Sequence, residues 1–165
     1  MNILELSEQE IVRRNSLNRL REMGIDAYPA EEFVVDAWSE EEPRQVRMAG
    51  RVMSRRIMGK ASFMELQDSK GRIQVYVNRD ELCPDEDKTL YNEVFKKLLD
   101  IGDFVGVTGF VFRTQTGEIS IHAKSLKLLS KSLKPLPIVK QKDGVTYDAF
   151  DDPELRYRQR YVDLI

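Results

Sequence analysis

The spacing of apolar residues changes near Pro43, and this change constrains the fold of the chain more than any other feature. Apolar residues recur at helical intervals before that point and at the two-residue interval of strands after it. Val46, Met48 and Val52 fit one long strand, in which Gly50 permits a bend or a bulge. The 165 residues suffice for one ordinary domain with an appendage. We therefore expect a helix followed by a β domain.

The predicted N-terminal helix has a clear start and end. Ser7 and Glu10 have the spacing of a capping box, and Gly24 provides a C-terminal stop. The expected apolar stripe consists of Ile11, Val12, Leu17, Leu20 and Met23. The arginines of this helix fall mostly off that stripe: Arg13, Arg14, Arg19 and Arg21. We expect them on a solvated face, with phosphate contact as the alternative.

The remaining signals give a definite order of strands and one helix. The expected elements are strands over residues 62–67 and 72–78, a helix over 89–99, and strands over 104–113 and 119–128. Asp68-Ser69-Lys70-Gly71 is a strong hairpin signal between the first two of these strands. Five strands with a helix between the third and fourth is the order of an oligonucleotide/oligosaccharide-binding (OB) barrel. We therefore predict a mainly β fold, a five-stranded OB barrel with an N-terminal amphipathic helix.

This order divides the chain into three segments. Residues 1–43 hold the helix and an extended connection, residues 44–134 the barrel, and residues 135–165 a linker with the first segment of a further domain. The last segment is too short for a domain, and its charged helix after Pro153 has no C-terminal cap. We therefore expect the natural protein to continue beyond this segment.

Composition excludes several classes of protein. One cysteine, Cys83, excludes a disulfide framework, and one histidine, His122, excludes most zinc sites. No apolar stretch approaches the ~18 residues of a spanning helix, and the first residues lack the pattern of a secretory signal. No nucleophile–base–acid set and no phosphate-binding glycine loop is recognisable. We expect a cytoplasmic location, with neither a metal site nor catalytic residues in this chain.

The net charge of −2 conceals a strong segregation of charge. Residues 44–63 and 122–142 carry basic side chains and no acidic ones, whereas acids concentrate in residues 31–42 and 80–87. Phosphate binding depends on the local field rather than on the total charge. A nucleic-acid partner therefore remains a candidate, and solvated charged faces are the alternative.

The predicted hairpin gathers aromatic and polar side chains on one face. If Gln67 pairs with Arg72, then Phe63, Gln74 and Tyr76 lie together on the outward side. Exposed aromatic rings stack on nucleic-acid bases, and a neighbouring amide can read base edges. Three basic side chains just upstream could neutralise the phosphates: Arg55, Arg56 and Lys60. The alternative packs Phe63 under the N-terminal helix or at a subunit contact.

Several motifs of the chain closely resemble the anticodon-binding domain of bacterial-type class II lysyl-tRNA synthetases. They are AGRVMSRRIMGKASF (49–63), LQD (66–68), GRIQVYV (71–77), TGEISIH (116–122), LKPLP (133–137) and RYRQRYVDLI (156–165). The resemblance covers almost the whole chain. The aspartyl and asparaginyl enzymes share the pattern of arginine, glycine, lysine and phenylalanine, but the exact sequence of the first motif resembles that of the lysyl enzymes.

The resemblance implies a set of anticodon-binding residues: Phe63, Gln74, Arg55, Arg56, Glu118 and His122. By this resemblance, Phe63 stacks on the central uridine, Gln74 bonds to an anticodon base, and Glu118 lies near the third base. Arg55 and Arg56 contact bases or phosphates. For His122 the resemblance gives weaker support than for the other residues. Additional candidates for contact with the RNA backbone are Lys60, Arg51 and Arg72.

The resemblance also implies a partner and a parent enzyme. The partner is lysine tRNA, and the parent is a homodimer that uses ATP and Mg²⁺ to activate lysine. Its catalytic motifs would lie beyond Ile165, so this chain alone is expected to need no cofactor, to be inactive, and to be monomeric or weakly self-associating. Alternatives are the domain of an aspartyl or asparaginyl enzyme, a general single-strand-binding barrel, and a protein-interaction domain.

Overall fold

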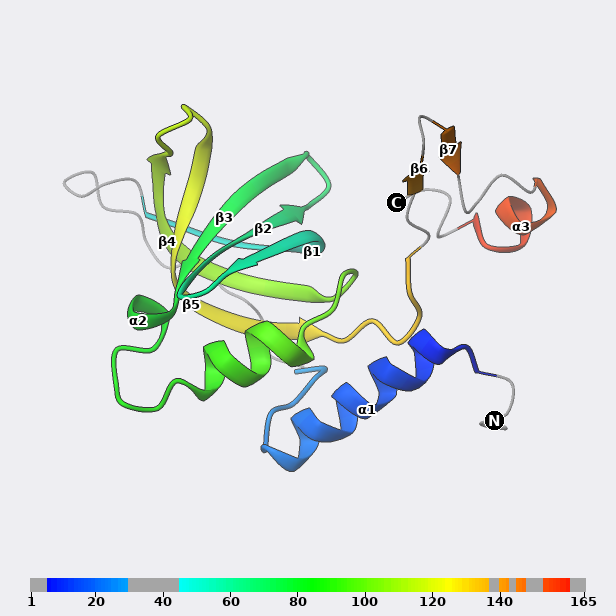
Figure 1. Cartoon of the computed structure of the whole chain (residues 1–165), viewed down its shortest axis with the longest axis horizontal. Helices are drawn as coiled ribbons and strands as arrows, with labels where there is room; N and C mark the ends of the chain where they lie inside the picture. Colours follow the sequence, from blue (N-terminus) through cyan, green and yellow to red (C-terminus); the bar gives the residue numbers. More distant parts are fainter. Residues whose placement is uncertain (1–5, 30–44, 137–139, 143–144, 148–152, 161–165) are drawn as a thin grey trace. The chain divides into compact units, whose positions relative to one another are not determined.

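The computed structural model describes residues 6–29, 45–136, 140–142, 145–147 and 153–160 (Figure 1). The chain forms two compact units, residues 1–134 and 135–165. The second unit contains the antiparallel strands β6 (Lys140–Lys142) and β7 (Val145–Tyr147) and the helix α3 (Pro153–Arg158). The helix after Pro153 was expected, whereas the strand pair has no clear sequence signal because each strand is only three residues long.

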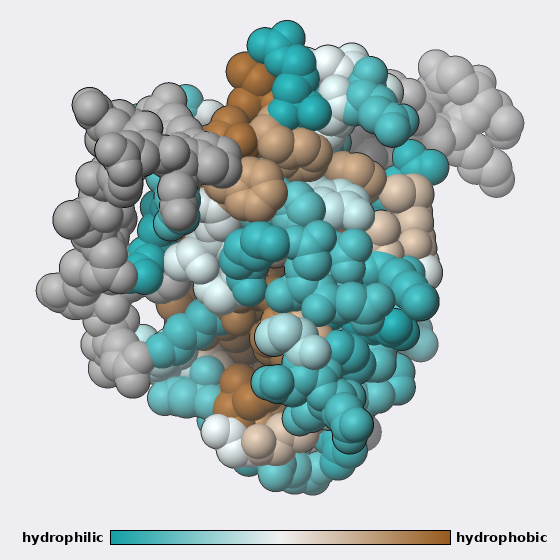
Figure 2. Space-filling view, turned by 90° about the vertical axis from the view of Figure 1, so that its left-hand side faces the viewer, coloured by the Kyte–Doolittle hydropathy of each residue, from teal (hydrophilic) through white to brown (hydrophobic). Residues whose placement is uncertain are grey.

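Five strands of the first unit form a closed barrel. They are β1 (Gln45–Met58), β2 (Ala61–Gln67), β3 (Arg72–Asn78), β4 (Phe104–Arg113) and β5 (Ile119–Ser130). Their order around the barrel is β1-β2-β3-β5-β4, closed by the pairing of β1 with β4, and only β3 and β5 run parallel. This arrangement confirms the predicted OB fold. The face drawn in Figure 2 is mostly hydrophilic, because the apolar residues of the strands point inward.

The described residues of the first unit also form the helices α1 (Glu8–Glu22), α2 (Arg79–Leu82) and η2 (Leu90–Leu98). The predicted helix between the third and fourth strands is η2, and it is a π-helix rather than an α-helix, with Leu99 N donating to the carbonyl of Val94, five residues earlier, at 2.9 Å. The single turn α2 overlaps the acidic segment of residues 80–87 and is not among the predicted elements.

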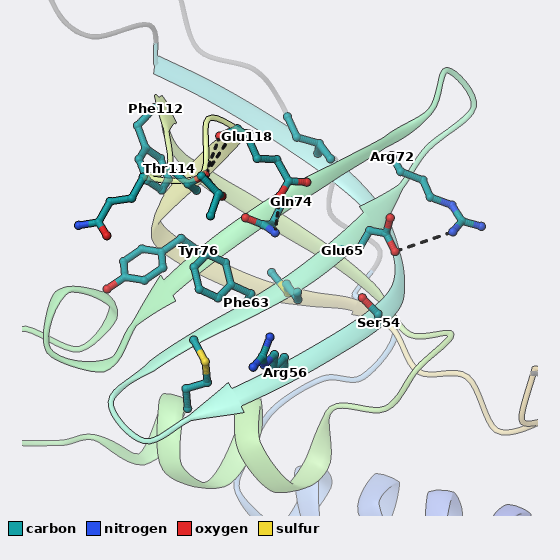
Figure 3. A pocket seen from close by; sticks show the side chains of 15 residues that line it. Ser54, Arg56, Phe63, Glu65, Arg72, Gln74, Tyr76, Phe112, Thr114 and Glu118 are labelled. Atoms are coloured by element: carbon teal, nitrogen blue, oxygen red, sulfur yellow. Dashed lines mark hydrogen bonds and ion pairs between the residues drawn. The ribbon is translucent and has the colours of Figure 1, made fainter. Parts of the chain in front are cut away.

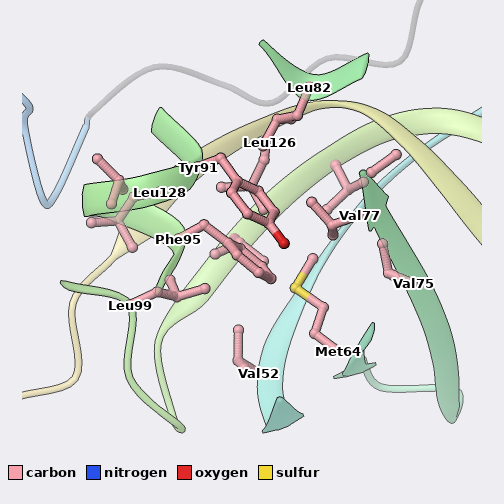
Figure 4. Packing of buried hydrophobic residues seen from close by; sticks show 14 of the residues in the cluster. Val52, Met64, Val75, Val77, Leu82, Tyr91, Phe95, Leu99, Leu126 and Leu128 are labelled. Atoms are coloured by element: carbon pink, nitrogen blue, oxygen red, sulfur yellow. The ribbon is translucent and has the colours of Figure 1, made fainter. Parts of the chain in front are cut away.

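The core lies between the barrel strands and η2. Tyr91 and Phe95 of η2 stack with ring centroids 5.4 Å apart, and both are fully buried against side chains such as Met64 and Val77 (Figure 4). The Tyr91 hydroxyl lies 2.7 Å from that of the buried Ser62, so the polar end of the ring is satisfied. The helix between β3 and β4 therefore closes one end of the barrel.

The buried face of α1 differs from the predicted stripe. The capping box is present as expected, with Ser7 N donating to Glu10 at 3.0 Å, and Leu17 and Leu20 are buried. Ile11 and Val12, however, are 38% and 46% exposed, so their predicted burial is wrong. Arg13 takes the inward position instead.

Arg13 is buried because its guanidinium satisfies carbonyl groups in the segments just before β4 and just after β5. It donates to the carbonyl oxygens of Ile101 at 2.8 Å and Ser132 at 3.1 Å. The expectation of a solvated Arg13 is therefore wrong. A buried cation is tolerated here because two hydrogen bonds replace its lost hydration.

The second basic stretch also contributes a buried cation to the structure. Lys131 is 3% exposed, and its Nζ lies 2.5 Å from Asp100 Oδ2 and 2.7 Å from Asp103 Oδ2. Asp103 accepts two further hydrogen bonds, from the backbone N–H groups of Asp100 and Ser132, each at 2.8 Å. The lack of acids within residues 122–142 therefore overstates the free positive charge of that stretch.

Candidate nucleic-acid interface

A concave pocket of about 740 Å³ opens on the outer face of the β2–β3 hairpin (Figure 3). Side chains of β1, β2 and β3 line it on one side, and the end of β4 with the β4–β5 turn line it on the other. Its polar and aromatic lining includes Ser54, Arg56, Phe63, Glu65, Arg72, Gln74, Tyr76, Phe112, Thr114 and Glu118. Five of the predicted binding or backbone-contacting side chains thus meet in one pocket: Phe63, Gln74, Arg56, Glu118 and Arg72.

The hairpin has the predicted register, and this register places the aromatic side chains. Gln67 pairs with Arg72, Glu65 with Gln74, and Phe63 with Tyr76. The Phe63 and Tyr76 ring centroids are 5.2 Å apart, and Phe112 of β4 meets Tyr76 at 6.0 Å. Asp68 fixes the turn by accepting the N–H groups of Lys70 at 2.7 Å and Gly71 at 3.0 Å, and these bonds lower the pKa of its carboxyl group. The three rings form an aromatic wall beside the polar groups.

The amide of Gln74 lies in a short hydrogen-bonded chain at the upper side of the pocket in Figure 3. Its Nε2 donates to Glu118 Oε2 at 3.0 Å, and its Oε1 accepts from the hydroxyl of Ser120 at 2.9 Å. Ser120 is fully buried, whereas Glu118 is exposed. The amide is thereby held beside Phe63 with its remaining hydrogen-bonding capacity available.

A bulge in β1 decides which of two adjacent arginines faces the pocket. The β1–β2 register shifts between Val52 and Ser54, so Arg56 rather than Arg55 stands opposite Phe63. A one-residue shift moves every later side chain of a strand to the other face. Arg56 lines the pocket, is exposed, and makes no ion pair or hydrogen bond within the described residues.

Arg55 points to the opposite side of β1. It stands opposite the buried Met64, donates a hydrogen bond to the carbonyl oxygen of Phe95, and lies 5.8 Å from the centroid of the Phe95 ring. Burial lowers the pKa of its guanidinium. Arg55 therefore does not line the pocket with Phe63 but caps the end of η2, and its expected contact with a base or a phosphate stays a prediction.

The other basic candidates are dispersed over the barrel. Arg72 lines the pocket, where its Nε donates to Gln67 at 2.8 Å and its Nη1 lies 3.8 Å from Glu65. Arg51 lies over the ring of Phe104, 4.4 Å from its centroid, and burial lowers its pKa. Neither Arg51 nor Lys60, in the exposed turn after β1, is among the described residues that line the pocket.

His122 lies beside the pocket rather than in it. It stacks on Phe110 with centroids 4.8 Å apart, and Tyr76 meets its edge at 4.9 Å. Its Nε2 is 3.0 Å from the carboxylate of Glu81 in α2, but within the described residues it has no well-aligned hydrogen-bond partner. A hydrogen bond from Lys124 is the main cause that lowers the pKa of Glu81. His122 therefore supports the aromatic wall from behind Tyr76.

Comparison with known proteins places the barrel in a family. The tRNA anti-codon family, described as an OB-fold nucleic acid binding domain, matches residues 46–129. The chain belongs to this family. Two proteins named lysine–tRNA ligase share high identity with it: that of Porphyromonas gingivalis (62% over 176 residues, 100% of this chain) and that of Azobacteroides pseudotrichonymphae (66% over 169 residues, 97% of this chain).

This OB-fold anticodon-binding domain corresponds to the N-terminal region of lysine–tRNA ligases. It spans 30% of the length of the Porphyromonas protein and 34% of the Azobacteroides protein. A third lysine–tRNA ligase, from Christiangramia forsetii, is 58% identical over 97% of this chain, and the match spans 29% of the length of that protein. No helix among the described residues is long and apolar enough to cross a membrane.

The predicted site residues include neither Phe112, which lines the pocket, nor Ser120, which is buried and bonded to Gln74. Phe112 and Ser120 come from β4 and β5, far from the hairpin along the chain, and they meet it only through the pairing of β3 with β5 and of β4 with β5. The alternation of β5 does place Ser120 on the face of Glu118 and His122, which is the one signal that could have identified it.

Proposed function

We propose that this domain recognises the anticodon of lysine tRNA through the pocket on the β2–β3 hairpin. The observation that carries the proposal is the convergence of Phe63, Gln74 and Arg56 on one concave surface of an anticodon-binding OB domain. Phe63 stacks on the central uridine, the Gln74 amide bonds to a base edge, and Arg56 neutralises a phosphate. The similarity to proteins named lysine–tRNA ligase supports lysine tRNA as the partner.

Glu118 completes this proposal at the β4–β5 turn. Its carboxylate accepts only one hydrogen bond from a side chain among the described residues, that of Gln74, so it retains acceptor sites for an amino or imino group of a neighbouring base. We assign it to the third anticodon base. His122 contributes by holding Tyr76, and Lys60 and Arg51 are not part of the pocket lining.

The whole protein is proposed to be a lysine–tRNA ligase of the cytoplasm and a homodimer. ATP, with Mg²⁺, would supply the adenylyl group that activates lysine, with pyrophosphate as the leaving group, and we assign both to the part of the relatives' length that this chain does not span. In this proposal residues 135–165 are a linker and the first segment of the catalytic domain.

The central base of the anticodon provides the test. An anticodon stem-loop of lysine tRNA with UUU should bind at least about 5-fold more tightly than the same stem-loop with a purine in the centre, since each mismatched contact costs about 1–3 kcal/mol. Fluorescence anisotropy at fixed salt measures both. Equal binding of the two stem-loops, or of a uridine-free single strand, would favour a general single-strand-binding barrel instead. Capture by protein alone after nuclease treatment would favour a protein-interaction domain.

The two adjacent arginines should respond differently to salt. Arg56→Gln is expected to reduce the slope of log Kd against log salt by about 0.7, the value for one phosphate contact of a single strand. Arg55→Gln is the matched control: it should leave the slope unchanged and lower the thermal midpoint, because it removes the bond to the carbonyl of Phe95. Titrations at several salt concentrations check both. A reduced slope for Arg55→Gln alone would contradict the assignment.

A further inference from the structure

The Gln74 amide is bonded at both ends by groups of different chemistry. Gln74 and Ser120 pair across the parallel strands β3 and β5, which brings the buried hydroxyl within 2.9 Å of Oε1. On the other side, Nε2 donates to the carboxylate of Glu118 at 3.0 Å. Figure 3 shows Gln74 directed at Glu118 along the rim of the pocket.

The carboxylate determines which way round the amide lies. An ionised carboxylate can only accept hydrogen bonds, so it must face the NH₂ group. Rotation of the amide by 180° would set Oε1 against Glu118 and replace a hydrogen bond by repulsion between two acceptors. The hydroxyl of Ser120 then donates to Oε1 and anchors the amide in that position. The pair therefore selects one orientation of a group that is otherwise free to rotate.

The remaining capacity of the amide is one N–H and one lone pair of Oε1. Uracil and cytosine differ in what they present at N3, because uracil carries an N3–H donor and cytosine an N3 acceptor. A base edge that meets both amide groups needs them in a fixed order, because uracil presents its N3–H beside the acceptor O4 and cytosine presents its N3 acceptor beside an amino donor. An amide that can rotate pairs with either edge, whereas an amide fixed with Oε1 and Nε2 in one order pairs fully with only one of them. A buried or half-buried unpaired polar group is costly, so a fixed amide discriminates between the two pyrimidines.

We propose that Ser120 and Glu118 are positioning residues that fix the Gln74 amide so that this domain accepts uracil and rejects cytosine. The inference rests on the proposed function, since it concerns the base that Gln74 meets. It also assigns Glu118 a role in addition to contact with a neighbouring base. Ser120 is fully buried, so its effect on base preference must act through Gln74.

Four stem-loops test the proposal: UUU, and the same loop with cytosine at the first, second or third anticodon position. Glu118→Gln is isosteric and exposed, and it permits the reversed amide, because the new side chain can also donate. Glu118→Gln should reduce the preference for uracil about 5- to 10-fold at the position of the base that Gln74 meets, which is the value of about one hydrogen bond. Ser120→Ala should reduce the preference at the same position. Ser125→Ala on the same strand, whose hydroxyl meets Thr108, is the control and should change none.

The outcomes separate the inference from the proposed function. If both variants fold and keep the same base preference at every position, the inference that Ser120 and Glu118 fix the Gln74 amide is wrong, and the proposed function is unaffected. A loss confined to Glu118→Gln, or an equal loss for all four loops in Ser120→Ala, would also overturn it. In the first case Glu118 would act only through its own contact with a base and not through Gln74, and in the second Ser120 would act only on stability. If the unaltered chain binds all four loops equally, the proposed function fails as well.

Discussion

Replacing Lys131 by methionine is expected to lower the free energy of unfolding by about 3–5 kcal/mol, the cost of leaving a buried charge without its partner. Lys131 is almost fully buried between Asp100 and Asp103, and Asp103 is itself fully buried. Methionine fills much of the volume of the lysine stem, so the loss comes mainly from the unpaired carboxylate. Urea unfolding followed by circular dichroism measures the effect.

The pH dependence of this variant distinguishes an unpaired charge from a packing defect. Burial raises the pKa of Asp103, and Lys131 opposes that rise. Without Lys131, the folded-state pKa of Asp103 lies further above its unfolded value, so the folded state binds the proton more tightly. The deficit in stability should therefore be largest at neutral pH and should shrink as the pH falls through the raised pKa toward about 3.9.

A second substitution supplies the control for Lys131→Met. Adding Asp103→Asn removes the unpaired charge while it keeps an acceptor for a backbone N–H group, and it should restore part of the stability at neutral pH. A deficit that is the same at pH 5 and pH 7 would contradict the electrostatic account and indicate a cavity.

Phe63→Ala is expected to weaken binding of the UUU stem-loop by about 1–3 kcal/mol, roughly 5- to 150-fold in Kd, the range for one base stacked on an aromatic ring. Phe63 lines the pocket, and its ring is tilted by 57° from that of Tyr76, so the side of the ring that faces the pocket is accessible to a base. Anisotropy titrations at constant salt provide the measurement. Because Phe63 is half-buried, thermal unfolding of the variant must show that the barrel is still folded.

Two variants make the Phe63 result specific. Phe63→Trp retains a stacking surface and should bind within a few-fold of the original chain. Phe104→Ala removes a ring that is 37% exposed, lies over Arg51 and does not line the pocket, and it should leave the affinity unchanged. An equal loss of affinity for Phe63→Ala and Phe104→Ala would indicate a general effect on the barrel and would contradict the assignment of Phe63 to base stacking.

The hairpin shows how far local patterning reaches. Alternation over residues 62–78 and the Asp68–Gly71 turn predict both the register and the shared face of Phe63, Gln74 and Tyr76, because a turn of fixed length sets the pairing of its two strands. The order of the five strands likewise follows from the spacing of apolar residues and glycines, and the OB fold is predicted correctly.

The adjacent residues Arg55 and Arg56 show what local patterning does not predict. Ser54, Arg55 and Arg56 are all polar or basic, so no apolar residue among them indicates which side of β1 faces the core and which faces the pocket. The bulge after Val52 is fixed by the pairing of β1 with both β2 and β4, and it sends Arg56 to the pocket and Arg55 to η2. A local pattern carries no signal for such a shift.

By itself, the sequence determined the barrel, its capping helix and the face on which Phe63 and Gln74 lie, because these depend on periodicity and turn chemistry between residues close along the chain. Only the tertiary structure decided which charges are buried: Arg13 and Lys131 look like solvated basic residues until carbonyl groups and carboxylates distant in sequence surround them. It also brought Ser120 to Gln74 across β3 and β5. The physical reason is that a charged or polar side chain takes its partner from the folded surroundings, which no local pattern specifies.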